Sequence, residues 1–149
     1  MTVNMTSMHD LINLRADVAR LRLLGRDLVL ALPTDRLAEC YNGTGPEFLP
    51  QRIRQKLDAV CRPFLPAFMV HDVDFSFSDC TRRSFLIANQ HLFWNCIICA
   101  CDAHPWYSWR RYALILEAWA IYRACHKFGW IAWIQAYNKN TYKKGNTNE

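Results

Sequence analysis

Leucine and valine residues recur every three or four positions through the first quarter of the chain, with polar residues between them. This spacing puts the apolar side chains on one face of an α-helix. Ser7, with Asp10 three residues later, resembles a capping box, and Pro33 follows the last apolar position. We therefore predict one long amphipathic helix within residues 1–34. Packing onto its own domain is favoured over a coiled-coil seam because the repeat is short. The apolar positions are Leu11, Leu14, Val18, Leu21, Leu28 and Leu32.

Helical spacing returns in two later segments, residues 81–101 and 108–128, which follow the mostly apolar run of residues 67–77. Residues 35–50 contain CYNGTGPEFLP, whose glycines and prolines predict an irregular loop, and residues 51–61 predict a short basic helix. Gly129 predicts a break after the last helix, and residues 138–149 predict a polar, loose tail. No segment alternates as a strand does. The pattern predicts an all-α protein with a single domain over residues 1–149.

Composition says only a little about the surfaces that this domain contacts and about its location. The chain has 149 residues, 52% of them hydrophobic, and a formal net charge of +5, which suits contact with an anionic surface without requiring it. Its apolar runs are too short to span a bilayer, and its charged N-terminal stretch lacks the apolar centre of a secretory signal. We therefore expect a cytoplasmic protein whose seven cysteines are mostly reduced core residues.

A glycine-containing loop and a His-Asp pair are the two features that point to chemistry. In YNGTGP, Gly43 and Gly45 let the backbone turn so that carbonyl oxygens converge, and a carboxylate such as Asp72 completes the oxygen ligands that calcium prefers. His71 projects about 100° away from Asp72 around a helix, towards a water that it can deprotonate. The ordinary alternative is a turn and a solvated pair, and Asp74 adds a third polar group to the same apolar run, FMVHDVDFSF.

YNGTGP followed by HD resembles the phospholipase A2 superfamily. The chain is most similar to small phospholipase A2-like proteins of phages and bacteria, which have an NGxG loop, an HD pair, an A-D-x-x-F stretch on the next helix and a last helix rich in arginine and aromatic residues. The corresponding last segment here is WRRYALILEAWAIYRACHKFGWIAW. The order of these features matches over residues 40–134. The resemblance implies long antiparallel helices and an ester hydrolase that uses calcium.

The resemblance also implies roles for individual residues. The carbonyl groups of Tyr41, Gly43 and Gly45 and the side chain of Asp72 would bind calcium, and His71 would deprotonate the attacking water. The residue that holds this histidine from the antiparallel helix falls at Asn89, where the family has a carboxylate. The family often has tyrosine four residues after the histidine, and this chain has Phe75. An amide orients an imidazole but does not stabilise an imidazolium as a carboxylate does.

Cysteines supply two competing interpretations. Cys96, Cys99, Cys101 and His104 have the spacing C-x₂-C-x-C-x₂-H, which suggests zinc, but on a continuous helix Cys101 points away from the other two thiols. A buried core is favoured over a metal site. The second interpretation is a thiol nucleophile at Cys61, Cys80 or Cys125 with His126 or His91, for which the local sequence offers little support.

Aromatic and basic residues gather near the start of the last helix. Trp106, Trp109, Arg110 and Arg111 suit a membrane interface or, less well, single-stranded nucleic acid. We predict that Trp106 and Trp109 are exposed. Trp94 and Trp119 lie on helical faces and are predicted to belong to the core.

Two functions remain. The first is a calcium-dependent, phospholipase A2-like hydrolase that cleaves a glycerophospholipid ester at a phospholipid or membrane surface. The alternative is a phage-type protein that has lost catalysis and uses this fold to bind and inhibit a host protein complex.

Overall fold

The computed structural model describes residues 8–41, 52 and 60–145, with side chains described as far as residue 138. These residues form helices, and none of them forms a strand, which confirms the all-α prediction. The elements are α1 (Met8–Arg20), α2 (Arg26–Ala31), α3 (Thr34–Cys40), the short 3₁₀ helix η1 (Arg62–Phe64), α5 (Leu65–Ser76), α6 (Arg82–Ala103) and α7 (Trp109–Gly145). Most of the YNGTGP loop and of the predicted basic helix at residues 51–61 lies outside the described residues.

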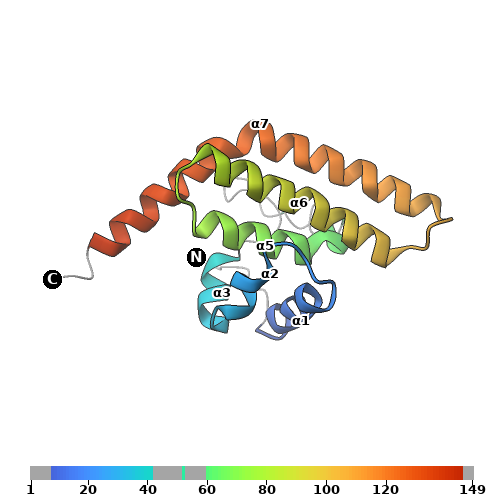
Figure 1. Cartoon of the computed structure of the whole chain (residues 1–149). Helices are drawn as coiled ribbons and strands as arrows, with labels where there is room; N and C mark the ends of the chain where they lie inside the picture. Colours follow the sequence, from blue (N-terminus) through green and yellow to red (C-terminus); the bar gives the residue numbers. More distant parts are fainter. Residues whose placement is uncertain (1–7, 42–51, 53–59, 146–149) are drawn as a thin grey trace.

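Three helices stack side by side, with α6 between α5 and α7 (Figure 1). The short helices α1, α2 and α3 cover the other side of α5, away from α7. The main core lies among these layers and contains Val18 and Leu37 from the short helices, Met69 and Val73 from α5, and Leu92 from α6. α5 therefore lies between two packed layers, which explains why six of its residues are buried.

The turn between α5 and α6 makes the two helices antiparallel. The Thr81 hydroxyl caps α6 by accepting a hydrogen bond from the Ser84 backbone N–H, at 3.2 Å. Asp79 accepts hydrogen bonds from the Thr81 backbone N–H at 2.9 Å and from the Ser84 hydroxyl at 2.6 Å. The buried Ser78 hydroxyl donates to the carbonyl of Trp133, at 3.0 Å, and so ties the turn to α7. This reversal places the middle of α6 against the middle of α5.

The prediction of one helix over the N-terminal segment is wrong. The chain leaves the helical conformation after α1, with positive φ at Arg22 (52°) and Gly25 (80°), and resumes as α2 and then α3. Asn95 of α6 holds this turn: its side chain accepts from the Leu24 N–H at 2.8 Å and donates to the Leu24 carbonyl at 2.9 Å. Leu11 and Val18 are nevertheless buried, so the predicted apolar face does pack onto its own domain.

The predicted break at Gly129 is also wrong, because α7 continues through it as far as Gly145. A Cβ at Gly129 would lie 3.4 Å from the Phe85 ring and 3.6 Å from the Phe75 ring. A Cβ at this position would make only ordinary van der Waals contact with the two rings, so the packing of α7 here leaves room for a small side chain. The helix also includes much of the segment predicted as a loose tail, and residues 146–149 lie outside the described part of the chain.

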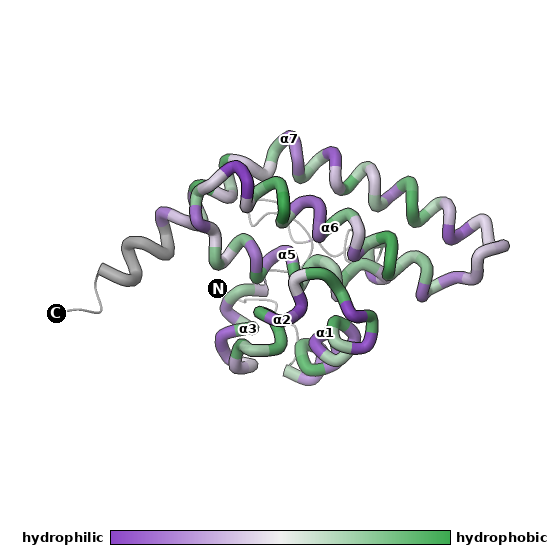
Figure 2. Tube along the Cα trace, viewed as in Figure 1, coloured by the Kyte–Doolittle hydropathy of each residue, from purple (hydrophilic) through white to green (hydrophobic). Residues whose placement is uncertain are grey.

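By length and apolar composition, α6 is the one helix among the described residues that could cross a membrane. It is also the central helix of the stack, in contact with both α5 and α7, and 44% of its most apolar window is buried. Figure 2 shows the hydrophobic positions along α6, several of which, such as Leu92 and Cys96, are core residues. Packing between two helices accounts for its apolar composition without a bilayer.

Candidate active site

His71 lies on α5 and Asn89 on α6, and the structure brings the two side chains together. Nε2 of His71 is 3.4 Å from Oδ1 of Asn89, at the long end of hydrogen-bond distances. Asn89 is fully buried, whereas His71 is partly buried. The contact that the resemblance implied between the two positions is therefore present, although its chemical role is a separate question.

A second hydrogen bond fixes the orientation of the Asn89 amide. Its Nδ2 donates to the backbone carbonyl of Phe85, at 3.1 Å, so Oδ1 is the atom that faces the imidazole. A carbonyl oxygen accepts hydrogen bonds, so Nε2 of His71 carries the proton in the neutral ring. The lone pair then resides on Nδ1, which is the arrangement that a general base needs.

Burial makes His71 a weak base. Desolvation of the charged ring is the largest effect and lowers the pKa of His71 from 6.5 to about 4, against smaller opposing effects of the Asn89 hydrogen bond and the Asp74 charge. The imidazole is therefore neutral at pH 7 and free to accept a proton. Its low pKa also limits how strongly it can pull a proton from water.

Aromatic rings form one wall beside His71. The ring of Phe75 lies 4.4 Å from the imidazole, centroid to centroid, and Trp133 packs edge-on against Phe75 at 4.8 Å. Phe85 and Trp130 belong to the same hydrophobic cluster, which is smaller than the main core. The buried Nε1 of Trp133 has no hydrogen-bond partner among the described residues. This wall explains much of the desolvation of His71.

An acid–imidazole pair, Asp74 and His91, lies between the same two helices. Oδ2 of Asp74 is 3.6 Å from Nδ1 of His91, and neither atom has a hydrogen-bond partner among the described residues. Gly25 approaches this pair so closely that a Cβ there would lie 3.1 Å from Nδ1 of His91. The pairing of Asp74 with His91 was not predicted from the sequence. In antiparallel helices, residues further along α5 face earlier residues of α6, so the contact between His71 and Asn89 does not by itself predict the one between Asp74 and His91.

The predicted calcium ligands are only partly within the described residues. Gly43 and Gly45 lie outside them. Tyr41 follows α3 and lines a groove at the amino end of α5, whereas Asp72 is six residues beyond Pro66 of that groove, about 9 Å along the helix. Among residues 8–41, 52 and 60–145, no group of three or more His, Cys, Asp or Glu side chains is arranged to hold a metal ion. The oxygen donors named from the sequence suit a hard cation, but three of the four are backbone carbonyls.

The cysteine interpretations lose support from the structure. Cys96 and Cys99 are buried, and burial raises the pKa of both thiols, that of Cys99 to about 12. The Cys101 sulfur instead accepts a hydrogen bond from Nη2 of Arg111, at 2.7 Å. Burial also raises the pKa of Cys125 to about 11, so its thiolate is scarce at neutral pH. Cys96 and Cys99 therefore behave as small core side chains.

The surface residues follow the prediction only in part. Trp106, Trp109 and Arg110 are exposed, but Arg111 is partly buried by its contact with Cys101. Trp94 and Trp119, predicted to be core residues, are more than half exposed. The exposed aromatic surface is therefore larger than the sequence suggested and extends along α7.

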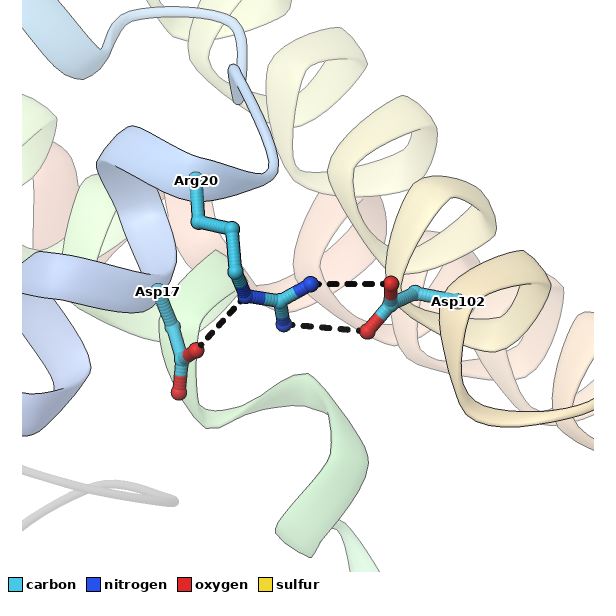
Figure 3. A network of polar contacts seen from close by, with 3 residues as sticks. All are labelled: Asp17, Arg20 and Asp102. Atoms are coloured by element: carbon cyan, nitrogen blue, oxygen red, sulfur yellow. Dashed lines mark hydrogen bonds and ion pairs between the residues drawn. The ribbon is translucent and has the colours of Figure 1, made fainter.

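The groove that Tyr41 lines, of about 640 Å³, lies between α1, the amino end of α5 and the carboxyl end of α6. Arg20 lines it and binds both carboxylate oxygens of Asp102, at 2.9 and 3.0 Å, and Asp17 at 3.2 Å (Figure 3). These side chains are exposed, so the network contributes little to the stability of the fold. Its effect is to link α1 to α6. His71 and Asn89 do not line this groove.

Comparisons with family models, with curated proteins and with solved structures find no match to this chain.

Proposed function

We propose that this protein is a calcium-dependent, phospholipase A2-like hydrolase that cleaves a glycerophospholipid ester with a water activated by His71. The observation that carries the proposal is the contact between His71 and Asn89 across antiparallel helices. It joins the two positions where the resemblance implies the catalytic histidine and the residue that orients it. The orientation of the Asn89 amide, with Oδ1 towards the ring, leaves the Nδ1 lone pair as the base.

The reaction needs one proton transfer to the imidazole and one from it. His71 accepts a proton from water through Nδ1 while the water oxygen bonds to the ester carbonyl carbon. The bond from that carbon to the alcohol oxygen then breaks, and the imidazolium returns its proton to the leaving oxygen. The products are a fatty acid and a lysophospholipid. Calcium, when held by Asp72 and the carbonyls of Tyr41, Gly43 and Gly45, would stabilise negative charge on the carbonyl oxygen.

Asn89 and the low pKa of His71 together predict a slow enzyme. Asn89 orients the ring without supplying negative charge to the imidazolium, and the corresponding acid-to-amide change in a serine protease lowers turnover about 10⁴-fold. Asp74 supplies part of the missing charge, since it raises the pKa of His71 against the larger effect of burial.

The test is release of fatty acid from mixed micelles, measured with calcium and with chelator. We expect wild-type release to require calcium and His71→Gln to lose it, while His9→Gln, at an exposed histidine of α1, keeps the wild-type rate. Equal release by wild type and His71→Gln, or by wild type with and without calcium, would refute the proposal.

A binding protein that inhibits a host complex is the second candidate, and it is favoured by the exposed aromatic and basic residues at the start of α7. Charge reversal at Arg110 should then abolish capture of the partner, whereas His71→Gln should leave it intact. Arg111 is a poor choice for this test because its guanidinium contacts Cys101.

A further inference from the structure

The solvent face of α7 carries a straight row of large side chains. Trp109, Tyr112, Leu116 and Trp119 are spaced by three and four residues and lie on one side of the helix. They are 74%, 55%, 70% and 56% exposed, whereas Ala118 on the opposite side is fully buried. We call these four residues the α7 stripe. Trp106 and Tyr107, in the turn before the helix, extend it and are equally exposed.

Cations accompany the stripe. The guanidinium of Arg110 lies 5.9 Å from the centre of the Trp109 ring, and that of Arg123 lies 5.8 Å from the Trp119 ring. Lys127, one turn beyond Arg123, lies 5.2 Å from the ring of Phe128, which is also exposed. Each of these three cations therefore lies beside an exposed aromatic ring of α7.

Acidic groups do not balance these cations. Residues 82–145 contain nine Arg and Lys residues and two acids, Asp102 and Glu117. Asp102 is paired with Arg20, and Glu117 accepts a hydrogen bond from the Cys61 thiol at 3.6 Å. A partner for this face must therefore bring negative charge as well as apolar contact.

These two requirements discriminate among partners. A second copy of the chain would bring Arg110, Arg123 and Lys127 near their own counterparts without an acid to pair with, which disfavours self-association. Single-stranded nucleic acid satisfies the cations, but Leu116 offers no ring on which a base can stack. An anionic bilayer meets both needs, because indole and phenol rings favour the head-group region and the cations meet lipid phosphate.

We propose that α7 docks on an anionic lipid surface, parallel to the membrane plane, through the α7 stripe and its flanking cations Arg110 and Arg123. This docking does not depend on His71 chemistry, so it holds or fails separately from the proposed hydrolase.

Sedimentation with vesicles in the presence of chelator tests the proposal without calcium bridging. The two vesicle types are phosphatidylcholine alone and phosphatidylcholine with about a third phosphatidylglycerol. We expect at least about tenfold stronger partitioning onto the anionic vesicles. Trp109→Ala with Trp119→Ala, and Arg110→Glu with Arg123→Glu, should each reduce it by about tenfold or more.

Matched controls come from exposed residues on the other side of the molecule. Ile12→Ala on α1 and Arg36→Glu on α3 should partition like wild type, as should His71→Gln. Circular dichroism establishes that each variant is folded before it is compared.

Three results would overturn the proposal. The first is equal partitioning by wild type and both stripe variants, and the second is no preference for anionic vesicles. The third is a protein that does not bind vesicles but uses the α7 stripe to form a dimer or to bind a single-stranded oligonucleotide. Vesicle binding without fatty-acid release would reject the hydrolase and leave the docking surface standing.

Discussion

Acidification from pH 7 to pH 5 is expected to destabilise the protein through His71. The pKa of this histidine is 6.5 in the unfolded chain and about 4 in the fold. Between those values the unfolded state binds a proton that the folded state does not, so stability is lost as the pH falls. The two pKa values imply a loss of about 2 kcal/mol between pH 7 and pH 5. Carboxylates contribute little over this range, because their ordinary pKa values lie near 4.

Denaturant unfolding followed by tryptophan fluorescence, in chelator at both pH values, measures this loss. In His71→Gln the difference between the two pH values should shrink by about 2 kcal/mol, because glutamine preserves a polar contact for Asn89 but does not titrate. The comparison cancels the contributions of the other histidines, and His9→Gln should keep the wild-type difference. If wild type and His71→Gln show the same pH dependence, the inference that His71 is desolvated and neutral in the fold is wrong.

Three further substitutions test the surroundings of the site. Asn95→Ala should lower the free energy of unfolding by about 1–3 kcal/mol, measured by denaturant unfolding, because both backbone groups of Leu24 lose their side-chain partner. Gly25→Ala should cost about 1–2 kcal/mol in the same assay because of its positive φ, and an unchanged stability would contradict the left-handed turn. Asn89→Asp should raise the pKa of His71, because a carboxylate favours the imidazolium. The pKa is measured by NMR titration in chelator. A lower or unchanged pKa would contradict the contact between the two side chains.

The helices that carry the candidate site could be predicted in part. Apolar spacing placed most of α6, whereas the resemblance placed His71 on a helix and Asn89 opposite it, where the structure also has them. Their antiparallel pairing follows from the short turn at residues 77–81, whose Asp and Thr are typical of a helix start.

The break between α1 and α2 could not be predicted, because the apolar spacing continues through it. Leu21 and Leu28 fit the same helical face, and an isolated glycine between them is tolerated in many helices. What fixes the turn is Asn95, a residue 71 positions away, which binds both backbone groups of Leu24. Gly129 gave the opposite error, because an isolated glycine does not end a helix and α7 continues through it beside Phe85 and Phe75.

The exposed face of α7 was underestimated for a related reason. Both sides of this helix carry large apolar residues, so spacing alone does not say which side is buried. Ile115 and Ile121 pack against the core, while Trp119 between them faces solvent. Only the position of α6 decides between the two faces.

Product analysis after incubation with a defined phosphatidylcholine and calcium tests the central claim, water activation by His71, most directly. Mass spectrometry should find fatty acid and lysophospholipid in equal amounts with the wild-type protein, and neither above background with His71→Gln. Equal yields from both proteins, or none from the folded wild type with calcium, would contradict the account.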